Sequence, residues 1–297
     1  FEVAGIGPAG ENLVTYASII SSRHRVAGRT GGGAVMGSKN LKAIAIRGFK
    51  GIPIYNRQAF FKAIDAVWAA HEKIARVRDG QKIYGTLRAT TFYQRLGGNA
   101  YRNDQVARLP EDKADKLSHH WYLQNIQSSF DTCSPGCTWG CDGRYKIKGN
   151  ESPEAKKLAG LSGYKPEYLA VASLGIMTDI ADMPAVAYLN DKMRKYGMDL
   201  MEVGACAGML MELWQRGIIN DRDTAEWVGQ PLSLEWGSVE AVEKIIDSIA
   251  LQDNKLGNLL KEGVYRAALK LEEIKEGPVR KYVLYGKGGS PFNEELR

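Results

Sequence analysis

Three closely spaced cysteines are the residues of this chain with the clearest chemistry. Cys133, Cys137 and Cys141 are separated from one another by three residues each, and the 297-residue sequence contains four cysteines in all. Thiolates are the ligands of iron–sulfur clusters and of many zinc sites. The spacing is looser than that of the paired cysteines in a zinc ribbon. We therefore predict an iron–sulfur site, and keep a zinc site or cysteines without a metal as the alternatives.

A second chemical signal is the uneven distribution of charge. The sequence has 40 Lys and Arg against 34 Asp and Glu, a net charge of +6. No acid occurs between Glu11 and Asp65, whereas this stretch holds nine basic residues: Arg23, Arg25, Arg29, Lys39, Lys42, Arg47, Lys50, Arg57 and Lys62. Because the rest of the chain is close to neutral, no nucleic-acid partner is expected. The pattern favours a local anion site, with a solvated basic face as the alternative.

Two glycine patterns near the start of the chain imitate nucleotide-binding motifs without fitting them. Gly5, Gly7 and Gly10 match G-x-G-x-x-G behind a strand. A dinucleotide site needs an acid about 20 residues later, and none occurs before Asp65. Residues 32–39 resemble a Walker A loop, but here the serine precedes the lysine, which reverses the order that the motif requires. We predict neither a Rossmann fold nor a P-loop.

The longer block around these glycines carries a more specific signal. Its glycines allow close backbone approach and its arginines can bind phosphates bidentately, which suits a bulky phosphorylated ligand. The segments IGPAGENL (6–13), HRVAGR (24–29) and GAVMGSKNLKAIAIRG (33–48) resemble the tungsten-containing aldehyde ferredoxin oxidoreductase family. The resemblance runs through most of the chain, and it implies a tungsten bis-pterin cofactor (tungstopterin) with a neighbouring [4Fe–4S] cluster.

The resemblance also implies which residues meet the pterin. Arg25, Val26 and Gly28 fall where the family contacts the pterin, and Arg29 follows in the same loop. A β-rich, pterin-cradling domain is expected before the first residue and a further helical region after the last. We therefore interpret the chain as a fragment of a longer enzyme.

A second pterin-contact motif reads Asp-x-x-Gly-Leu, followed by Asp or Cys, in the family. Gly197, Met198 and Asp199 match it, whereas Arg194 stands where the family has its first acid. A guanidinium cannot accept the hydrogen bonds that a carboxylate accepts from a pterin ring. Asp199 has an alternative role as a helix N-cap.

The family's cluster ligands are a tight cysteine triplet and a fourth cysteine much later in the sequence. In this chain the first gap of the triplet is one residue longer than the usual form. Cys206 lies in line with Leu200, Val203 and Leu210 on a predicted helix, so we assign it to the core. The fourth ligand is expected beyond the last residue.

The family also carries a Pro-Glu-Tyr-Glu segment whose second glutamate is thought to work near the metal. This chain reads Pro166-Glu167-Tyr168-Leu169, so leucine replaces that glutamate. Glu167 remains as the candidate catalytic residue. Its alternative role is a helix N-terminal carboxylate that interacts with the helix dipole.

The hydrophobic pattern predicts a mostly α, α+β fold. Strands are expected at 1–6 and 41–46, a basic glycine-rich loop at 22–33 and an amphipathic helix at 57–78. Further helices are expected near 166 and at 182–197, 199–217, 238–252 and 256–272, with Asp182 and Gly197 as start and stop signals. Residues 1–50 are interpreted as the end of an N-terminal tungstopterin-binding domain, and residues 51–297 as a helical domain that carries the cysteines.

These features together predict a cytoplasmic oxidoreductase. The default reaction converts an aldehyde, a small-molecule substrate, to a carboxylate, with electrons leaving through the cluster to ferredoxin or an Fe–S electron-transfer subunit. One alternative is a reductive subunit like the tungsten subunit of benzoyl-CoA reductase, since Leu169 removes an acid. Another is a non-catalytic electron-relay or scaffold subunit. No stretch is apolar and long enough for a membrane span, and an oligomer is expected.

Overall fold

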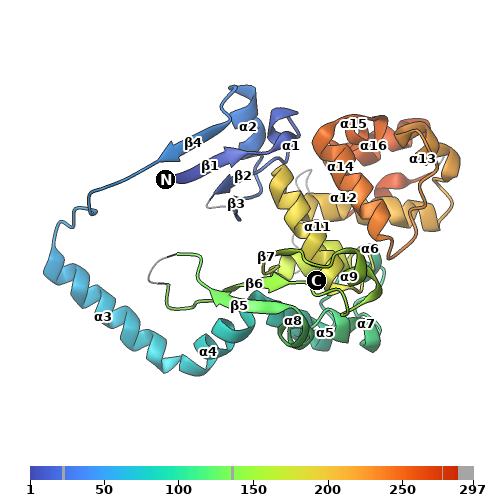
Figure 1. Cartoon of the computed structure of the whole chain (residues 1–297). Helices are drawn as coiled ribbons and strands as arrows, with labels where there is room; N and C mark the ends of the chain where they lie inside the picture. The colour runs from blue at the N-terminus through green and yellow to red at the C-terminus, as the bar shows by residue number, and fades with distance from the viewer. Residues whose placement is uncertain (22–23, 135–136, 276, 287–297) are drawn as a thin grey trace.

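The computed structural model describes residues 1–21, 24–134, 137–275 and 277–286. Helices dominate, and there are two small antiparallel sheets, one near the N-terminus and one near the middle of the chain (Figure 1). This arrangement confirms the predicted α+β, mostly α fold class. Within the described residues, no helix has the length and apolar character needed to cross a membrane.

The N-terminal sheet has four strands in the order β3–β2–β1–β4, and every neighbouring pair is antiparallel. Its strands are β1 (Glu2–Ile6), β2 (Ile19–Ser21), β3 (Arg25–Ala27) and β4 (Ala43–Ile46), and two short helices, α1 (Pro8–Glu11) and α2 (Gly32–Ser38), accompany them. Strand β3 and the start of α2 lie within the predicted loop 22–33, which is therefore more regular than expected. An antiparallel sheet with a four-residue helix behind β1 differs from the parallel βαβ unit of dinucleotide-binding folds.

The glycine turn after β1 serves close packing. A Cβ atom added at Gly7 would lie 2.3 Å from the carbonyl oxygen of Tyr196, and one added at Gly37 would lie 1.9 Å from the carbonyl oxygen of Gly10. Both glycines therefore allow backbones to approach more closely than any other residue would permit.

A connector and a helical arm follow the N-terminal sheet. Residues 47–56 are exposed throughout and lead into α3 (Arg57–Lys73) and α4 (Ala75–Tyr84). Figure 1 shows α3 lying apart from the rest of the molecule. None of the residues of α3 is buried, so the predicted amphipathic helix 57–78 exists, broken at Ile74, but its apolar face does not pack against the core.

A second sheet of three antiparallel strands, in the order β5–β6–β7, lies near the middle of the chain. The strands are β5 (Gln127–Asp131), β6 (Asp142–Lys146) and β7 (Ser162–Tyr164). The cysteine segment, residues 132–141, connects β5 to β6. The elements that precede this sheet are η1 (Gly85–Leu87), α5 (Arg88–Leu96), α6 (Tyr101–Asp104), α7 (Glu111–Lys116) and α8 (His119–Asn125).

The remaining helices build the core. They are α9 (Pro153–Lys157), α10 (Tyr168–Val171), a π-helical turn η2 (Ala172–Ile176), α11 (Met183–Tyr196), α12 (Leu200–Gln215), α13 (Asp221–Val228), α14 (Val239–Leu251), α15 (Lys255–Leu260), α16 (Val264–Ile274) and η3 (Val279–Tyr282). Helix α12 is buried from Met201 to Leu213, as expected for a helix that is apolar all round. Cys206 is fully buried on this helix, which confirms its assignment to the core.

Candidate functional site

The N-terminal sheet and the cysteine segment meet at one buried carboxylate. Asp142 directly follows Cys141, and its side chain is 2% exposed. Oδ2 of Asp142 accepts hydrogen bonds from Arg25 Nη2 at 2.6 Å and from His24 Nε2 at 2.8 Å. The ring of His24 also stacks on Tyr164, with 3.6 Å between the ring centroids. This junction brings the loop 24–29 next to the cysteine segment.

The charge of Asp142 is stabilised within the fold. Burial opposes its ionisation, but the Gly143 amide, which donates to Oδ1 at 2.8 Å, and the neighbouring His24 and Arg25 together lower its pKa. The carboxylate is therefore ionised in the folded protein and pairs with Arg25.

Replacing Asp142 by asparagine is expected to lower the free energy of unfolding by about 2 kcal/mol, because a buried charge-assisted contact to Arg25 is lost. Urea unfolding followed by circular dichroism measures the change. The matched control is Asp131→Asn, since Asp131 is 38% exposed and lies 3.4 Å from Arg144, and exposed pairs of this kind contribute about 0.5 kcal/mol. Equal losses in the two variants would contradict the prediction.

Glu167 shares the same arginine. Its Oε1 lies 3.4 Å from Arg25 Nη1, and its Oε2 accepts a hydrogen bond from the hydroxyl of Thr86. The Thr86 hydroxyl in turn accepts from the backbone N–H of Tyr168 at 3.0 Å. Glu167 is the N-cap residue of α10, but its side chain makes no capping hydrogen bond. Arg25 and Thr86 hold its carboxylate at the N-terminus of α10, a position that also fits the expected alternative of a helix N-terminal carboxylate.

The second predicted group of pterin contacts lies beside the first. Gly197 adopts a left-handed conformation, with φ of 74°, and ends α11. Met198 is buried, and Asp199 is the N-cap of α12, where its side chain accepts from the Met201 amide at 3.3 Å. Nε of Arg29 lies 3.4 Å from Oδ2 of Asp199. The structure therefore brings Arg29 and Asp199 together, and the N-cap role of Asp199 is confirmed.

The other two predicted pterin contacts in the loop 24–29, Val26 and Gly28, face open space. Val26 is 38% exposed. A Cβ atom added at Gly28 would meet only Val26 Cγ1, at 3.9 Å. No part of the described chain therefore requires glycine at this position, and the space beside it is available to another group.

The three clustered cysteines differ in their surroundings. Cys133 is exposed, whereas Cys137 and Cys141 are half-buried. Backbone N–H groups of Gly140 and Trp139 lower the pKa of the Cys137 thiol, and burial raises the pKa of Cys141. Across residues 1–21, 24–134, 137–275 and 277–286, no three His, Cys, Asp or Glu side chains converge as a metal-binding group. The metal assignment therefore remains a prediction that rests on the chemistry of the thiols.

Lys165 is a residue of this site that sequence reasoning missed. It is 1% exposed, and its Nζ donates to the carbonyl oxygen of Cys141. Its backbone N–H donates to Gly143 O at 2.8 Å. Burial lowers the pKa of this ammonium group. A signal was present, because Lys165 precedes the Pro166-Glu167 pair, but nothing in the sequence indicates that its long side chain turns inward.

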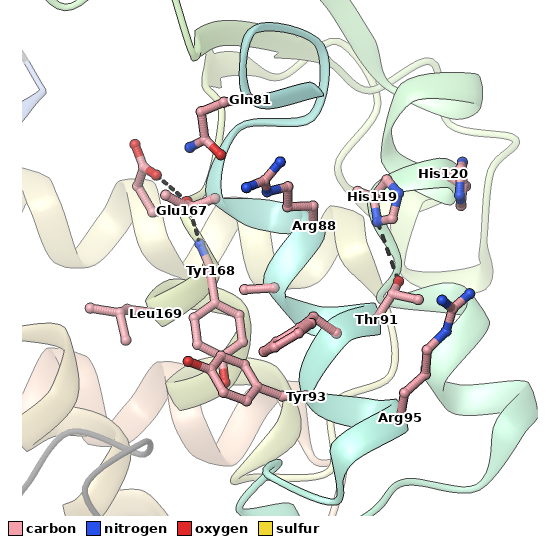
Figure 2. A pocket seen from close by; sticks show the side chains of 13 residues that line it. Gln81, Arg88, Thr91, Tyr93, Arg95, His119, His120, Glu167, Tyr168 and Leu169 are labelled. Carbon is pink, nitrogen blue, oxygen red and sulfur yellow. Dashed lines mark hydrogen bonds between the residues drawn. The ribbon is translucent and has the colours of Figure 1, made fainter. Parts of the chain in front are cut away.

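Two cavities border this junction. The α5 cavity, about 860 Å³ in volume, lies between α5, α8 and residues 167–169 (Figure 2). The β1 cavity, about 460 Å³, is bounded by β1, β7 and the end of α11. His24 and Arg194 both line the β1 cavity, whereas Glu167 and Leu169 line the α5 cavity. Each volume lies within the range of small-molecule sites.

Lowering the pH is expected to destabilise the protein through His119. Burial lowers the pKa of His119 to about 4, with further contributions from His120, Arg88 and Arg95. As the pH falls from about 6.5 to about 4, the unfolded chain binds a proton at this residue while the folded chain does not, so stability is lost across this window. Melting temperatures measured from pH 7 to pH 4 should therefore fall less steeply for His119→Asn than for the unmodified chain. Parallel curves would contradict the prediction.

Family models match nearly the whole chain. Residues 1–48 match the model of the aldehyde ferredoxin oxidoreductase N-terminal domain, and residues 62–290 match the model of domains 2 and 3 of the same family.

Curated relatives agree with this match. The tungsten-containing aldehyde ferredoxin oxidoreductase of Pyrococcus furiosus is 33% identical over 276 residues, which cover 90% of this chain and 41% of that protein. The protein of the same name from Thermococcus kodakarensis is 33% identical over 275 residues, with 90% and 41% covered. The aliphatic sulfonate oxidoreductase WOR-like subunit of Pyrococcus furiosus is 28% identical over 289 residues, with 95% and 42% covered. The chain thus spans about two fifths of the length of these relatives.

A solved structure shares the fold. The active-site complex BamBC of benzoyl coenzyme A reductase, in complex with 1,5-dienoyl-CoA, superposes with a TM-score of 0.71 at 20% sequence identity, over 95% of this chain and 40% of that one. The family resemblance seen in the sequence is confirmed by the two family models, which together extend from residue 1 to 48 and from 62 to 290. The chain belongs to the aldehyde ferredoxin oxidoreductase family.

Proposed function

We propose that this chain forms part of a tungsten-pterin oxidoreductase that oxidises an aldehyde to a carboxylate and passes the electrons through a [4Fe–4S] cluster to ferredoxin or an Fe–S electron-transfer subunit. The observation that carries the proposal is the position of Arg25. From the loop 24–29, its guanidinium reaches both Asp142, which adjoins Cys141, and Glu167, which borders the α5 cavity. One side chain therefore links the loop that resembles a pterin contact, the cysteine segment and a cavity of substrate size.

The residues around Arg25 fit an anionic, acceptor-rich cofactor. Among the described residues, Nε of Arg25 and Nη1 of Arg194 are buried without a hydrogen-bond acceptor. The closest acid to Arg194 Nη1 is Asp191, with Oδ1 at 3.7 Å. Guanidinium donors of this kind suit phosphate and pterin-ring acceptors. When bound, tungstopterin supplies a metal centre that exchanges electrons with the substrate, and we assign its contacts to Arg25, Val26, Gly28, Arg29, Gly197, Met198 and Asp199.

The cluster ligands in this proposal are Cys133, Cys137 and Cys141. Backbone amides that favour the Cys137 thiolate support the assignment, because the thiolate is the form that binds iron. The buried ammonium group of Lys165, at the backbone of Cys141, would help to set the electrostatic environment of the cluster.

Glu167 is the proposed catalytic carboxylate. Thr86 and Arg25 fix its orientation at the edge of the α5 cavity, so it can hold or release a proton at Oε1 or Oε2 beside a bound substrate.

We place the enzyme in the cytoplasm. Two similar proteins are described as a subunit and as part of a complex, which supports an oligomeric or multi-subunit assembly.

Elemental analysis of the complete, anaerobically purified protein tests the proposal. About one tungsten or molybdenum atom and about four irons for each copy of this chain are expected for a tungstopterin with one [4Fe–4S] cluster. Iron without tungsten or molybdenum would instead support an electron-relay or scaffold subunit. Zinc alone would contradict both functions.

A reductive reaction is the second candidate. Leu169 lines the α5 cavity at the position where the family carries a glutamate, so one acid–base group is replaced by an apolar side chain there. The fold shared with a benzoyl coenzyme A reductase complex is compatible with this candidate. Assays of aldehyde-dependent dye reduction and of dye-dependent dearomatisation, run on the same tungsten-loaded preparation, distinguish the two reactions.

A further inference from the structure

One face of α5 has a composition that the proposed function does not explain. Thr91, Phe92 and Arg95 lie three, four and seven residues after Arg88, so the four residues share one side of the helix. All four line the α5 cavity. Figure 2 shows Thr91 and Arg95 extending from α5 towards the side of the cavity that carries His119 and His120, whereas Arg88 extends towards Gln81.

The two arginines make the cavity positive. Among the described residues, neither Arg88 nor Arg95 has a carboxylate within ion-pair distance. Among the described residues that line the cavity, Glu167 is the single carboxylate, and it is already held by Arg25. Unpaired cations in a partly enclosed cavity attract an anion more strongly than the same cations on an open surface.

His119 contributes a neutral polar group to this cavity. His119 is 7% exposed, and burial together with His120 and the two arginines lowers its pKa to about 4. Near neutral pH its ring is uncharged, and its Nδ1 lies 3.3 Å from the hydroxyl of Thr91. This pair is a neutral hydrogen-bonding group between the two arginines.

The rest of the lining is apolar and aromatic. Tyr93 and Tyr168 stack at 5.2 Å between ring centroids, and Phe92 and Leu169 also border the space. Arg88 and Arg95 are two helical turns apart, about 10 Å along the axis. The volume of about 860 Å³ is much larger than a small inorganic anion requires. A ligand that matches both the positive charges and the large apolar space has an anionic group and a separate apolar or aromatic body.

We propose that the α5 cavity binds an organic anion, whose carboxylate, sulfonate or phosphate group is attracted by the positive charges of Arg88 and Arg95 and whose apolar body packs against Phe92, Tyr93 and Tyr168. This inference rests on the proposed function, because it assigns the anion to the substrate of the redox enzyme. The anionic group contributes to substrate binding and is distinct from the group that reacts near Glu167.

Calorimetric binding of simple probes to the complete protein tests the inference without turnover. Benzoate, benzenesulfonate and phenyl phosphate each have an anionic group and an aromatic body. Benzamide lacks the charge, and acetate lacks the aromatic body. We expect the best aromatic anion to bind at least about tenfold more tightly than benzamide and than acetate, since a charge-assisted bond and a buried ring are each worth about that factor. The ranking of the three anions identifies the anionic group.

Variants locate the binding to this cavity. Arg88→Gln and Arg95→Gln are each expected to weaken binding of the best aromatic anion at least about tenfold, with little effect on benzamide. The matched control is Arg266→Gln, an exposed arginine on α16 that lines neither cavity. Arg95 is itself exposed, so its variant should keep the melting temperature of the unmodified protein even if Arg88→Gln does not fold.

Three results would overturn the inference: benzamide binding as tightly as the anions, acetate binding as tightly as benzoate, or unchanged anion binding in the Arg95→Gln variant. Failure of the proposed function is seen separately, because it is read from the metal content. Selective anion binding without tungsten would retain this site and reject the enzyme. A tungsten-loaded protein that does not distinguish the probes would reject the site alone.

Discussion

Iron is expected to fall from about four atoms per chain to nearly none when Cys137 is replaced by serine, because the thiolate ligand is replaced by a hydroxyl that stays protonated. Cys137 is the strongest choice among the three cysteines, since backbone N–H groups of Gly140 and Trp139 already favour its thiolate. Iron and acid-labile sulfide are measured on anaerobically purified protein, together with the electron paramagnetic resonance spectrum of the reduced form.

The fourth cysteine provides the matched control. Cys206 is fully buried on α12, so Cys206→Ala should keep all of the iron and lose about 1 kcal/mol of stability through the vacated volume. A variant in which Cys133, Cys137 and Cys141 are all serine but which retains its iron would contradict the ligand assignment. One zinc atom per chain, lost in the same variant, would favour the zinc alternative.

Replacing Asp179 by alanine is expected to cause the largest loss of stability, about 3 kcal/mol, because it leaves two cations without their buried counter-ion. The carboxylate of Asp179 is 2% exposed and accepts hydrogen bonds from Arg102 Nη2 at 2.7 Å, Lys113 Nζ at 2.6 Å and the Tyr101 hydroxyl at 2.9 Å. Arg102 and Lys113 are about one-third exposed, so water compensates them in part, which places the loss at the low end for buried ion pairs. Urea unfolding measures the loss.

The Asp179→Asn variant distinguishes the effect of the lost charge from the effect of the backbone conformation at this position. Asp179 has a positive φ of 63°, a conformation that asparagine tolerates better than alanine. Asp179→Asn also retains hydrogen-bond acceptance at one oxygen, so its loss should be roughly half that of Asp179→Ala. If the alanine variant loses less than about 1 kcal/mol, the ion-pair network does not stabilise this corner of the fold as proposed.

Local sequence signals predicted the C-terminal helices closely. Asp182 and Gly197 flank α11 as expected, because a cap depends on residues within one turn of the helix end. The predicted helix 256–272 is instead divided into α15 and α16 at Gly263, where φ is 89° and an added Cβ would lie 2.5 Å from Oε1 of Glu202. That interruption depends on a residue 61 positions earlier in the sequence, which no local pattern reveals.

The sheet that holds the cysteine segment could not be predicted in the same way. Strands β5, β6 and β7 are three to five residues long and are separated by loops, so their alternation is too short to stand out. Their pairing is also non-local. The sequence therefore predicts a helical domain around the cysteine segment and no strands beside it. In the structure, the segment connects two paired strands, β5 and β6.

At the site, the sequence indicated Arg25 and Glu167 but not what joins them. The partner of Arg25, Asp142, is 117 residues away in sequence, and its role becomes visible only when β6 brings it beside the N-terminal loop. Its position directly after a predicted ligand, Cys141, is a signal that could have marked it. The spacing of Arg88 and Arg95, seven residues apart on α5, was also readable as one face of a helix, although which way this face points depends on α8.

The exposed connector between β4 and α3 has a consequence for how the molecule is assembled. The N-terminal sheet is held to the helical body by contacts that do not involve residues 47–56: Thr15 N to Lys261 O at 3.0 Å, Ser18 N to Gly197 O at 2.8 Å, and Arg25 to Asp142. The covalent link therefore contributes only a high effective concentration of one part near the other. A chain nicked by a protease within 47–56 should stay together as a non-covalent pair on a native gel, and the two parts could be produced as separate polypeptides that complement one another.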